Sequence, residues 1–402
     1  MIYRLEQDLK KLGSIGVYDG GVFRPSLSDA DIEAREFVKK LMLDAGLEIQ
    51  IDRAANIIGI RKGKKSSPFV TTGSHIDAGK RWGIFDGTLG VIGAIEAVRM
   101  MNEENIDTEL PLAIICFTDE EGTYELYSGS KYFTGLISKE ELYQKKNKYD
   151  GQIFGDLVKK ALPTKVIERF SYPIKYHIEL HIEQGPILEA KRKEIGVVSG
   201  IVGIRWLNLT FIGKQSHAGT TPMNLRNDPT IPASETILYL RKIVTKYPEM
   251  VGTSGLVKVS PNVINVIPGQ VEVGIDLRSL IKSDMEKALD EVTEEAKKFA
   301  EEEGCKVSFS ILEAQNPVPA SPEVMEVIKK SAEFLKYSYI VMPSRAGHDT
   351  QNMAKITKVG MIFVPSKGGI SHAPEEWTDF DQAHKGVEVL KRSLVELAGE
   401  GR

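Results

Sequence analysis

Residues 110–122 read LPLAIICFTDEEG, an apolar run that stops at three adjacent carboxylates. The apolar part has the length and the composition of a buried β-strand. The earlier run PFVTTGSH (residues 68–75) has the same character, and residues 88–104 between the two repeat apolar side chains at helical spacing. Strands that alternate with helices in this way are typical of a sheet covered on both faces. The N-terminal half of the chain is therefore predicted to be an α/β domain.

The pattern changes after residue 204. Residues 205–316 predict the order strand, helix, strand, strand, helix, strand, which is the βαββαβ order of a ferredoxin-like domain. The Pro-rich segment NPVPASPE (residues 316–323) follows, and α/β signals then resume. The sequence thus predicts one α/β domain made of residues 1–204 and 317–402, with residues 205–316 inserted as a second, smaller domain.

The composition excludes several classes of protein. The 402 residues carry a formal net charge of -4, with 42% hydrophobic and 27% charged residues, as in ordinary globular proteins. No stretch approaches the roughly 20 apolar residues of a membrane helix, and the short basic clusters give no argument for nucleic acid. The N-terminal segment resembles an amphipathic helix rather than a secretory signal, so a cytoplasmic location is expected.

Residues 73–87, GSHIDAGKRWGIFDG, place polar side chains directly after a predicted strand. His75 is expected at the carboxyl end of that strand, where open α/β sheets position their sites. Asp77 shares its face in an extended chain and is expected to accept a hydrogen bond from the His75 ring nitrogen that binds no ligand. Asp86 precedes a helical pattern, so it is either a functional carboxylate or simply the N-cap of that helix.

The three carboxylates of residues 119–121 repel one another and need an explanation. A single acid after a strand often caps the next helix or faces water. Glu120 and Glu121 point in different directions, so one can bind a metal ion while the other moves a proton, as metal-assisted hydrolysis requires. Asp119 is left with a capping or supporting role.

A third cluster lies in KYHIELHIEQGP, residues 175–186. Every second residue from 177 to 183 is a histidine or a glutamate, and in a strand these side chains share one face. We expect a half-buried strand whose polar side contains a metal ligand, although a surface ladder of mixed charge has the same pattern. The spacing does not decide between His177 and His181.

The loop GGISHAPEEW, residues 368–377, presents His372 after a predicted strand. This histidine could cap the helix that follows. Together with the other clusters it completes a set of imidazole and carboxylate groups, a mixture of nitrogen and oxygen ligands that suits Zn²⁺, Mn²⁺ or Co²⁺.

The inserted domain contributes three further candidates. His217 lies in a turn of small residues, residues 215–228. Arg278 is on the polar face of a predicted strand, where it either offers a fork to a substrate carboxylate or pairs with Asp276. Asn265 in NVIPG can add a neutral hydrogen bond to a substrate.

Nine motifs follow one another over nearly the whole chain: GSHIDAG, FDGTLGV, TDEEG, HIEQGP, SHAGTTPM, NVIPG, DLR, AGHD and GISHAPEE. In this combination the chain resembles the amidase and carbamoylase branch of the M20 metallopeptidase superfamily, which includes N-carbamoyl-L-amino acid hydrolases, allantoate amidohydrolases and β-ureidopropionases. The histidine of HIEQGP, where peptidase relatives usually have a carboxylate, points to this branch. The resemblance implies a zinc-peptidase-like α/β/α catalytic domain and an inserted lid domain through which family members form homodimers.

The resemblance also implies a role for each candidate residue. Two divalent ions per subunit (Zn, Mn or Co) are expected on one set of ligands: His75, Asp86, Glu121, His181 and His372, with Asp86 bridging. This choice selects His181 over His177. Glu120 is implied as the general base, with His217, supplied to the partner's site, and Asp77, acting through His75, as further catalytic residues. The implied substrate contacts are Gln184, His217, Asn265, Arg278 and Gly347.

The implied activity is hydrolysis of the ureido C–N bond of an N-carbamoyl-L-amino acid or a related ureido acid, which releases ammonia, carbon dioxide and the amino acid. The alternatives are an allantoate amidohydrolase, an M20-type aminopeptidase or dipeptidase, and a metal-dependent binding protein without catalysis. The chain departs from the family pattern at residues 123–125, at Arg345, and at Lys80 and Arg81. We expect these positions to affect substrate preference.

Overall fold

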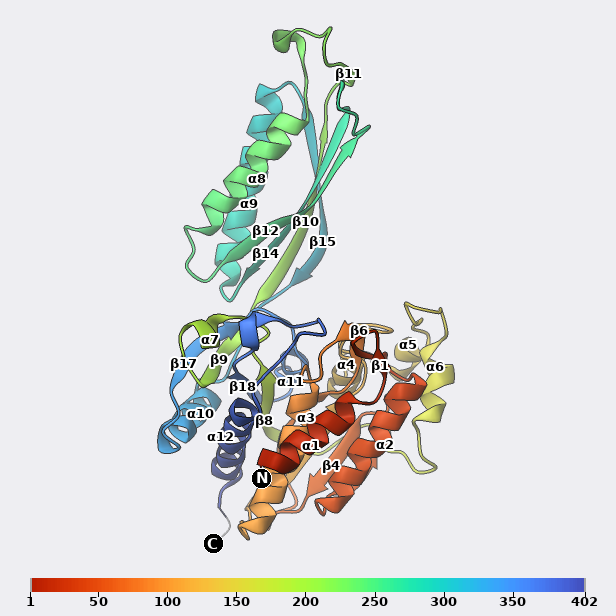
Figure 1. Ribbon diagram of the computed structural model, residues 1–402, viewed down its shortest axis with the longest axis vertical. Coiled ribbons are helices and arrows are strands. Elements are labelled where there is room, and N and C mark those ends of the chain that lie inside the picture. Colours follow the sequence, from red (N-terminus) through yellow and green to blue (C-terminus); the bar gives the residue numbers. More distant parts are fainter. Residues whose placement is uncertain (1, 401–402) are drawn as a thin grey trace. The chain divides into compact units, whose positions relative to one another are not determined.

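The computed structural model describes residues 2–400 and divides the chain into two compact units (Figure 1). One unit contains Met1–Gly200 and Ala320–Arg402, and the other contains Ile201–Pro319. The segment predicted as an insertion, residues 205–316, falls inside the second unit. Met1 and residues 401–402, which the predicted domain bounds include, lie outside the described residues.

The main sheet is mixed and has nine strands. They are β3 (Glu48–Ile51), β4 (Ile57–Arg61), β5 (Phe69–His75), β7 (Leu112–Phe117), β8 (Ile174–Ile182), β9 (Ile195–Ile201), β16 (Val318–Pro319), β17 (Tyr339–Ser344) and β18 (Lys358–Val364). Their order is β16-β9-β18-β8-β5-β7-β4-β3, and β17 pairs with β9. The neighbours β18, β8, β5 and β7 run parallel. Their carboxyl ends therefore meet at one edge of the sheet, where sites of α/β proteins form.

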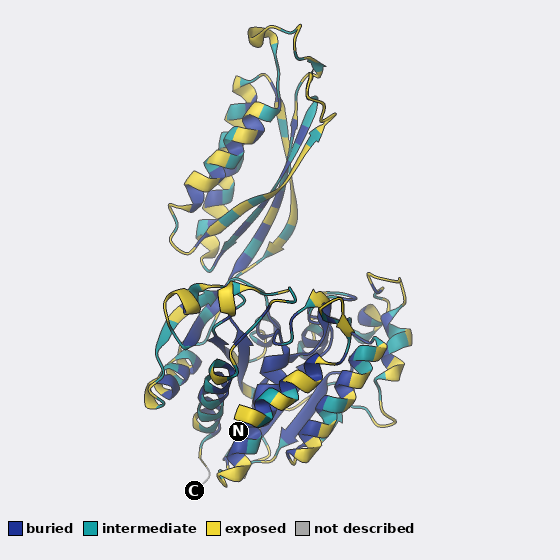
Figure 2. Cartoon of the chain, in the orientation of Figure 1, coloured by how far each residue is buried: buried dark blue, intermediate teal, exposed yellow. Residues whose placement is uncertain are grey.

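Helices cover both faces of this sheet, as the alternation of strands and helices predicted. The α-helices described in this unit are α1 (Ile2–Gly13), α2 (Asp29–Asp44), α3 (Thr88–Glu103), α4 (Ser128–Thr134), α5 (Lys139–Tyr143), α6 (Phe154–Leu157), α7 (Ile187–Ala190), α10 (Pro322–Phe334), α11 (Thr350–Met353) and α12 (Phe380–Ala398). The helices α1, α2, α3, α10 and α12 bury their apolar sides in one large core, whereas α4 and α11 contribute to a separate cluster with Phe117 and Phe133. The strands between them are buried (Figure 2). Within residues 2–400 no helix has both the length and the apolar character needed to cross a membrane.

Local signals fix the ends of α2. The Ser28 side chain accepts a hydrogen bond from the backbone N–H of Asp31, which caps the first turn. Gly46 follows the last turn with a φ of 78°, a left-handed conformation that favours glycine.

Strand β8 is more buried than its alternation predicted, so the expectation of a half-buried strand is wrong. It lies between β18 and β5 inside the sheet, and His177, Glu179 and His181 are all buried. The Glu179 carboxylate accepts hydrogen bonds from Ser74 Oγ and from the backbone N–H and Oγ1 of Thr350. Alternation shows which side chains share a face, but it does not show whether a further layer covers that face.

The second unit has the βαββαβ order that the sequence predicted. Its elements are β10 (Gly203–Ile212), α8 (Thr230–Val244), β12 (Val251–Ser260), β14 (Gln270–Ser279), α9 (Lys282–Glu302) and β15 (Lys306–Gln315), with the short strands β11 (Ser216–His217) and β13 (Val266–Ile267). The four long strands form an antiparallel sheet in the order β12-β14-β10-β15. Both helices pack on the apolar face of this sheet, where Val271, Val273, Ile275 and Leu277 of β14 are buried.

Candidate metal centre and active site

The parallel strands bring the predicted metal ligands together at one edge of the main sheet. His75 is the last residue of β5, His181 lies near the end of β8, and Glu121 follows β7. His372 lies in the loop between β18 and α12, and Asp86 lies between β6 (Ala78–Trp82) and α3. Residues far apart in the sequence thus form one cluster because neighbouring parallel strands end at the same edge.

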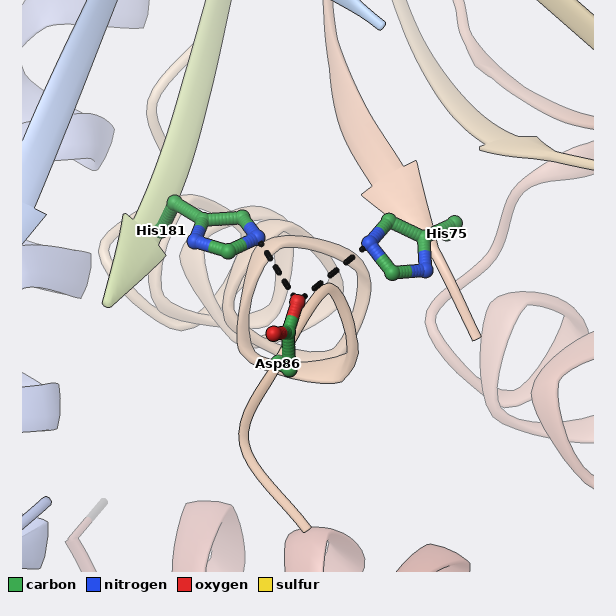
Figure 3. Close-up of side chains that lie close together, drawn as sticks. All are labelled: His75, Asp86 and His181. Carbon is green, nitrogen blue, oxygen red and sulfur yellow. Dashed lines mark ion pairs between the residues drawn. The ribbon is translucent and has the colours of Figure 1, made fainter. Parts of the chain in front are cut away.

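Asp86 is central to this cluster, and its two carboxylate oxygens face different groups. Oδ1 lies 3.5 Å from Nε2 of His75 and 3.3 Å from Nε2 of His181, and Figure 3 shows both rings pointing toward this oxygen. Oδ2 lies 3.0 Å from Nε2 of His372, which is 3.7 Å from Oε1 of Glu121. A carboxylate that presents one oxygen to each of two ligand groups is able to bridge two cations.

The alternative role of Asp86 as a helix cap is not what the structure contains. Gly87 is the N-cap residue of α3, and this helix has no side-chain cap hydrogen bond. The carboxylate of Asp86 instead accepts hydrogen bonds from Gln184 Nε2 at 2.8 Å and from Ser371 Oγ at 3.2 Å. Its side chain is therefore committed to the cluster.

The structure brings His181, and not His177, to the cluster. His181 belongs to two of the groups of His, Asp and Glu side chains whose ligand atoms lie within 4.8 Å of one another. His177 is four residues back along β8, where its Nδ1 lies 3.0 Å from Thr71 Oγ1. Burial lowers the pKa of His177 to about 3, so its ring is neutral.

The charges in the cluster fit a divalent cation. Burial, and next the charge of Glu121, raise the pKa of Glu120 well above its usual range, and burial with Asp86 does the same for Glu121. Burial acts against ionisation of Asp86 as well, but hydrogen bonds from the three histidines hold its pKa well below the usual range. A cation among these carboxylates relieves their repulsion, and imidazole with carboxylate ligands suits Zn²⁺, Mn²⁺ or Co²⁺.

The Asp77 carboxylate organises the acidic loop, and the Asp77 backbone carbonyl orients the ring of His75. The carboxylate accepts hydrogen bonds from the backbone N–H groups of Glu120 at 3.2 Å and Glu121 at 3.1 Å. Nδ1 of His75 lies 3.1 Å from the carbonyl oxygen of Asp77 and 3.6 Å from its carboxylate. The expected hydrogen bond to the ring is thus made by the carbonyl, since the carboxylate is occupied by the two amides. Glu120 Oε2 lies 3.7 Å from His75 Nε2.

Asp119 has the capping role that was expected of it. Its carboxylate accepts hydrogen bonds from the three backbone N–H groups of residues 123–125 and from Ser128 Oγ. Burial, together with the charge of Asp77, raises the pKa of Asp119 to about 8. The segment that departs from the family pattern, residues 123–125, is therefore a loop closed on Asp119.

Residues 61–396 match the family described as peptidase family M20/M25/M40. This chain belongs to that family. It is 35% identical over 402 residues to the N-carbamoyl-L-amino-acid amidohydrolase of Paenarthrobacter aurescens, covering 98% of this chain and 97% of that protein. It is 36% identical over 394 residues to the ureidoglycolate hydrolase of Arabidopsis thaliana, covering 94% and 82%. A crystal structure of an amidase of the hydantoinase/carbamoylase family from Burkholderia multivorans has a TM-score of 0.96 and 32% identity, covering 100% and 99%.

Family membership confirms the resemblance that the nine motifs indicated, and the α/β fold is that of an M20 hydrolase. The M20 motifs also contain the two predicted substrate contacts of the first unit. Gln184 Nε2 donates to Asp86 and lies 3.3 Å from His372 Nε2, whereas Gln184 Oε1 is buried without a partner. A Cβ added at Gly347 would lie 1.9 Å from the Tyr127 hydroxyl, so a larger residue there requires the Tyr127 side chain to move.

The other predicted contacts of this M20 chain lie in the second unit. His217 is exposed on β11, which pairs with β13, and the Asn265 carbonyl accepts a hydrogen bond from the backbone N–H of Ala218, so the two candidates are neighbours. Arg278 on β14 pairs with Asp276, with Nη2 and Oδ2 2.9 Å apart. The pairing that the sequence left open as an alternative is present, and the roles of all three toward a substrate stay predictions.

The sequence-based interpretation missed two side chains that hold this M20 cluster in place. Glu376 is buried, and its Oε1 accepts hydrogen bonds from the backbone N–H groups of Phe85 and Asp86. Its Oε2 accepts from Ser371 Oγ and from the backbone N–H of His372. Glu376 thus ties the Asp86 loop to the His372 loop. Its only signal in the sequence was its place in the motif GISHAPEE, where Glu375 and Glu376 are adjacent and residue type does not distinguish them.

The second missed side chain is Trp82 at the end of β6. Its ring stacks on that of His372, with centroids 3.7 Å apart and an interplanar angle of 11°. The His372 side chain is 45% exposed on a glycine-rich loop, so the stacked Trp82 ring restrains a predicted ligand that has little other packing. No spacing in the sequence relates these two residues.

Proposed function

We propose that this chain is a metal-dependent amidohydrolase that cleaves the ureido C–N bond of N-carbamoyl-L-amino acids or a related ureido acid. The observation that carries the proposal is the position of Asp86, with one oxygen toward His75 and His181 and the other toward His372, and with Glu120 beside His75. The 35% identity to an N-carbamoyl-L-amino-acid amidohydrolase over 98% of the chain supports the substrate class.

Two divalent ions, Zn, Mn or Co, fit the residues present. The ligands that would hold them are His75, Asp86, Glu121, His181 and His372. When bound, the ions activate a water molecule for attack and polarise the carbonyl oxygen of the ureido group.

Glu120 is the general base in this proposal. Its carboxylate is buried beside His75, and Asp77 holds its backbone N–H. It takes a proton from the attacking water and delivers it to the terminal nitrogen as the bond from the carbamoyl carbon to that nitrogen breaks. Ammonia leaves, and the N-carboxy amino acid that remains loses carbon dioxide to give the amino acid.

The other candidate residues bind and orient the substrate. Gln184 Oε1, which is buried without a partner, can accept a hydrogen bond from a ureido N–H. His217 donates to the oxygen on which negative charge develops, and Asn265 and Arg278 contact the substrate carboxylate. Gly347 lets the substrate approach the backbone.

We also propose that the chain forms a homodimer through its second unit. The β-sheet face opposite α8 and α9 exposes the large apolar side chains of Trp206 and Leu256. A second copy of the chain would cover them. Sedimentation equilibrium of the full chain tests this, and a monomer at micromolar concentration would contradict it.

Replacing Glu120 with Gln tests the proposed chemistry. The variant should keep its metal content while ammonia release from N-carbamoyl-L-amino acids falls by about 10²- to 10⁴-fold, the usual contribution of a general base. Glu375→Gln is the matched control, because this glutamate is exposed and has no role in the proposed chemistry. Near-normal rates of the Glu120 variant would contradict the assignment. Release of amino acids from dipeptides without ammonia from any ureido acid would favour an aminopeptidase instead.

A further inference from the structure

The first unit contains a cavity of about 430 Å³, and of the residues that line it only Gln184 takes part in the chemistry proposed above. Its walls are mainly apolar and are formed by Pro186, Ile187, Met342, Pro343 and Ala346. Its size lies within the range of small-molecule sites, about 300–1,000 Å³. An apolar cavity of this size is able to hold an aliphatic or thioether side chain.

The apolar wall is held in place before any ligand binds. Glu183 also lines the cavity, but its carboxylate accepts hydrogen bonds from the backbone N–H groups of Ile187 at 2.7 Å and Leu188 at 2.8 Å. These bonds fix the first turn of α7 and with it the Ile187 wall. Among the described residues that line the cavity, Arg345 is the only cation.

Gln184 joins this cavity to the metal cluster. It lines the cavity, and its Nε2 donates to Asp86 Oδ2 at 2.8 Å and lies 3.3 Å from His372 Nε2. A substrate whose ureido group lay at the cluster would therefore meet this cavity on the other side of Gln184, within the reach of one side chain. The substituent on its α-carbon is the group that the cavity can receive.

We propose that this cavity is the side-chain subsite and that it selects ureido acids with an apolar α-substituent, such as N-carbamoyl-L-methionine. This inference rests on the proposed function. Ureidoglycolate has a hydroxyl group at the α-carbon and allantoate has a second ureido group. Both groups would lose hydrogen bonds to water in an apolar cavity, and N-carbamoylglycine would leave it unfilled.

The test compares kcat/KM for ammonia release by the metal-loaded protein across five substrates: N-carbamoyl-L-methionine, N-carbamoylglycine, N-carbamoyl-L-glutamate, ureidoglycolate and allantoate. The methionine compound should exceed the glycine compound by about 10- to 200-fold, as expected for alkyl groups in an apolar pocket. Ala346→Leu, which fills the cavity, should lower that ratio at least about 10-fold. Val341→Ser is the matched control, because Val341 precedes Met342 in β17 but is exposed, and it should leave the ratio unchanged.

The inference is overturned if glycine and methionine compounds react equally well, if the glutamate compound is preferred through Arg345, or if Ala346→Leu keeps the wild-type ratio. Ile187→Ser provides a second variant in case Ala346→Leu does not fold, and it should lower the same ratio by making the wall polar. Absence of ammonia from every substrate would instead overturn the proposed function itself.

Discussion

Replacing Glu376 with Gln is expected to weaken metal binding about 10- to 100-fold without unfolding the chain. Glu376 is 2% exposed, and its hydrogen bonds go to the two loops rather than to the side chain of a predicted ligand. It acts mainly on the backbone, because it accepts hydrogen bonds from the N–H groups of residues 85 and 86 in one loop and of residue 372 in the other, and also from the Ser371 hydroxyl. Two predicted ligands thus depend on one carboxylate for their positions.

The size of the effect follows from what Gln is able to keep. If its single oxygen stays with the amides of Phe85 and Asp86, the bonds at 3.0 and 3.1 Å remain but lose the charge of the acceptor. The new NH₂ group then faces the N–H of His372, 3.4 Å from the carboxylate oxygen, whereas the hydroxyl of Ser371 can rotate and accept. A charged hydrogen bond contributes about 1.5–3 kcal/mol and a neutral one about 0.5–1.5. The net loss is about 1–3 kcal/mol, and about 1.4 kcal/mol corresponds to a tenfold change.

Competition with a chromogenic chelator measures the affinity for Mn²⁺ or Zn²⁺ in the wild type and the variant. Far-UV circular dichroism shows whether the variant is folded. Glu375→Gln is the control, since Glu375 is the adjacent acid and is exposed. If the Glu376 variant binds metal as tightly as the wild type and melts at the same temperature, Glu376 does not hold the two loops.

Three further changes probe the surroundings of the cluster. Trp82→Leu removes the ring that stacks on His372. It should weaken metal binding about 2- to 10-fold, since such ring pairs contribute about 0.5–1.5 kcal/mol. The same chelator assay measures the affinity, and Trp82→Phe should recover most of the loss. His177→Leu should flatten the fall of stability in acid. The pKa of His177 is about 3 in the folded chain and 6.5 in the unfolded chain, so below pH 6.5 only the unfolded chain takes up a proton at this residue. The free energy of unfolding of the wild type therefore falls by about 1.4 kcal/mol per pH unit below pH 6.5 because of this residue. Urea unfolding from pH 7 to 4 measures this, and equal slopes for both proteins would contradict it. Asp77→Asn should lower metal content and turnover together, unlike Glu120→Gln, because Asp77 holds the backbone N–H groups of Glu120 and Glu121. Mass spectrometry measures the metal content, and a variant with full metal content would contradict this reasoning.

The order of elements could be predicted from the sequence because each strand and helix has its own signal. Apolar runs of strand length and helical spacing in residues 88–104 are local features, and the structure has them where they were expected. Burial of β8 could not be predicted, because its alternation of His and Glu with Ile and Leu is equally suited to a solvated face. The layer that covers this face includes Thr350, which is 171 residues from its partner Glu179.

The candidate site was predictable in its residue types and less so in its contacts. Strand ends followed by His, Asp or Glu identified the cluster, yet His177 and His181 have the same periodicity, and only their different distances from the sheet edge separate them. The carboxylate and the carbonyl that lie near the His75 ring both belong to Asp77, so residue spacing could not show which of them accepts the hydrogen bond from the ring. Glu376 acts through backbone amides, which leave no pattern in side-chain chemistry.

The three adjacent carboxylates after β7 are compatible because their surroundings give each a different role. Asp119 turns inward, where three amides of residues 123–125 and one hydroxyl satisfy it, and this closes the loop. That closure, with Asp77 bound to the next two amides, directs the side chains of Glu120 and Glu121 toward the histidines. Burial raises the pKa of both glutamates, and so do the charge of Glu121 on Glu120 and the charge of Asp86 on Glu121; a divalent cation is the ligand that relieves this repulsion. The same crowding that destabilises the cluster on its own therefore favours the binding of a metal ion there.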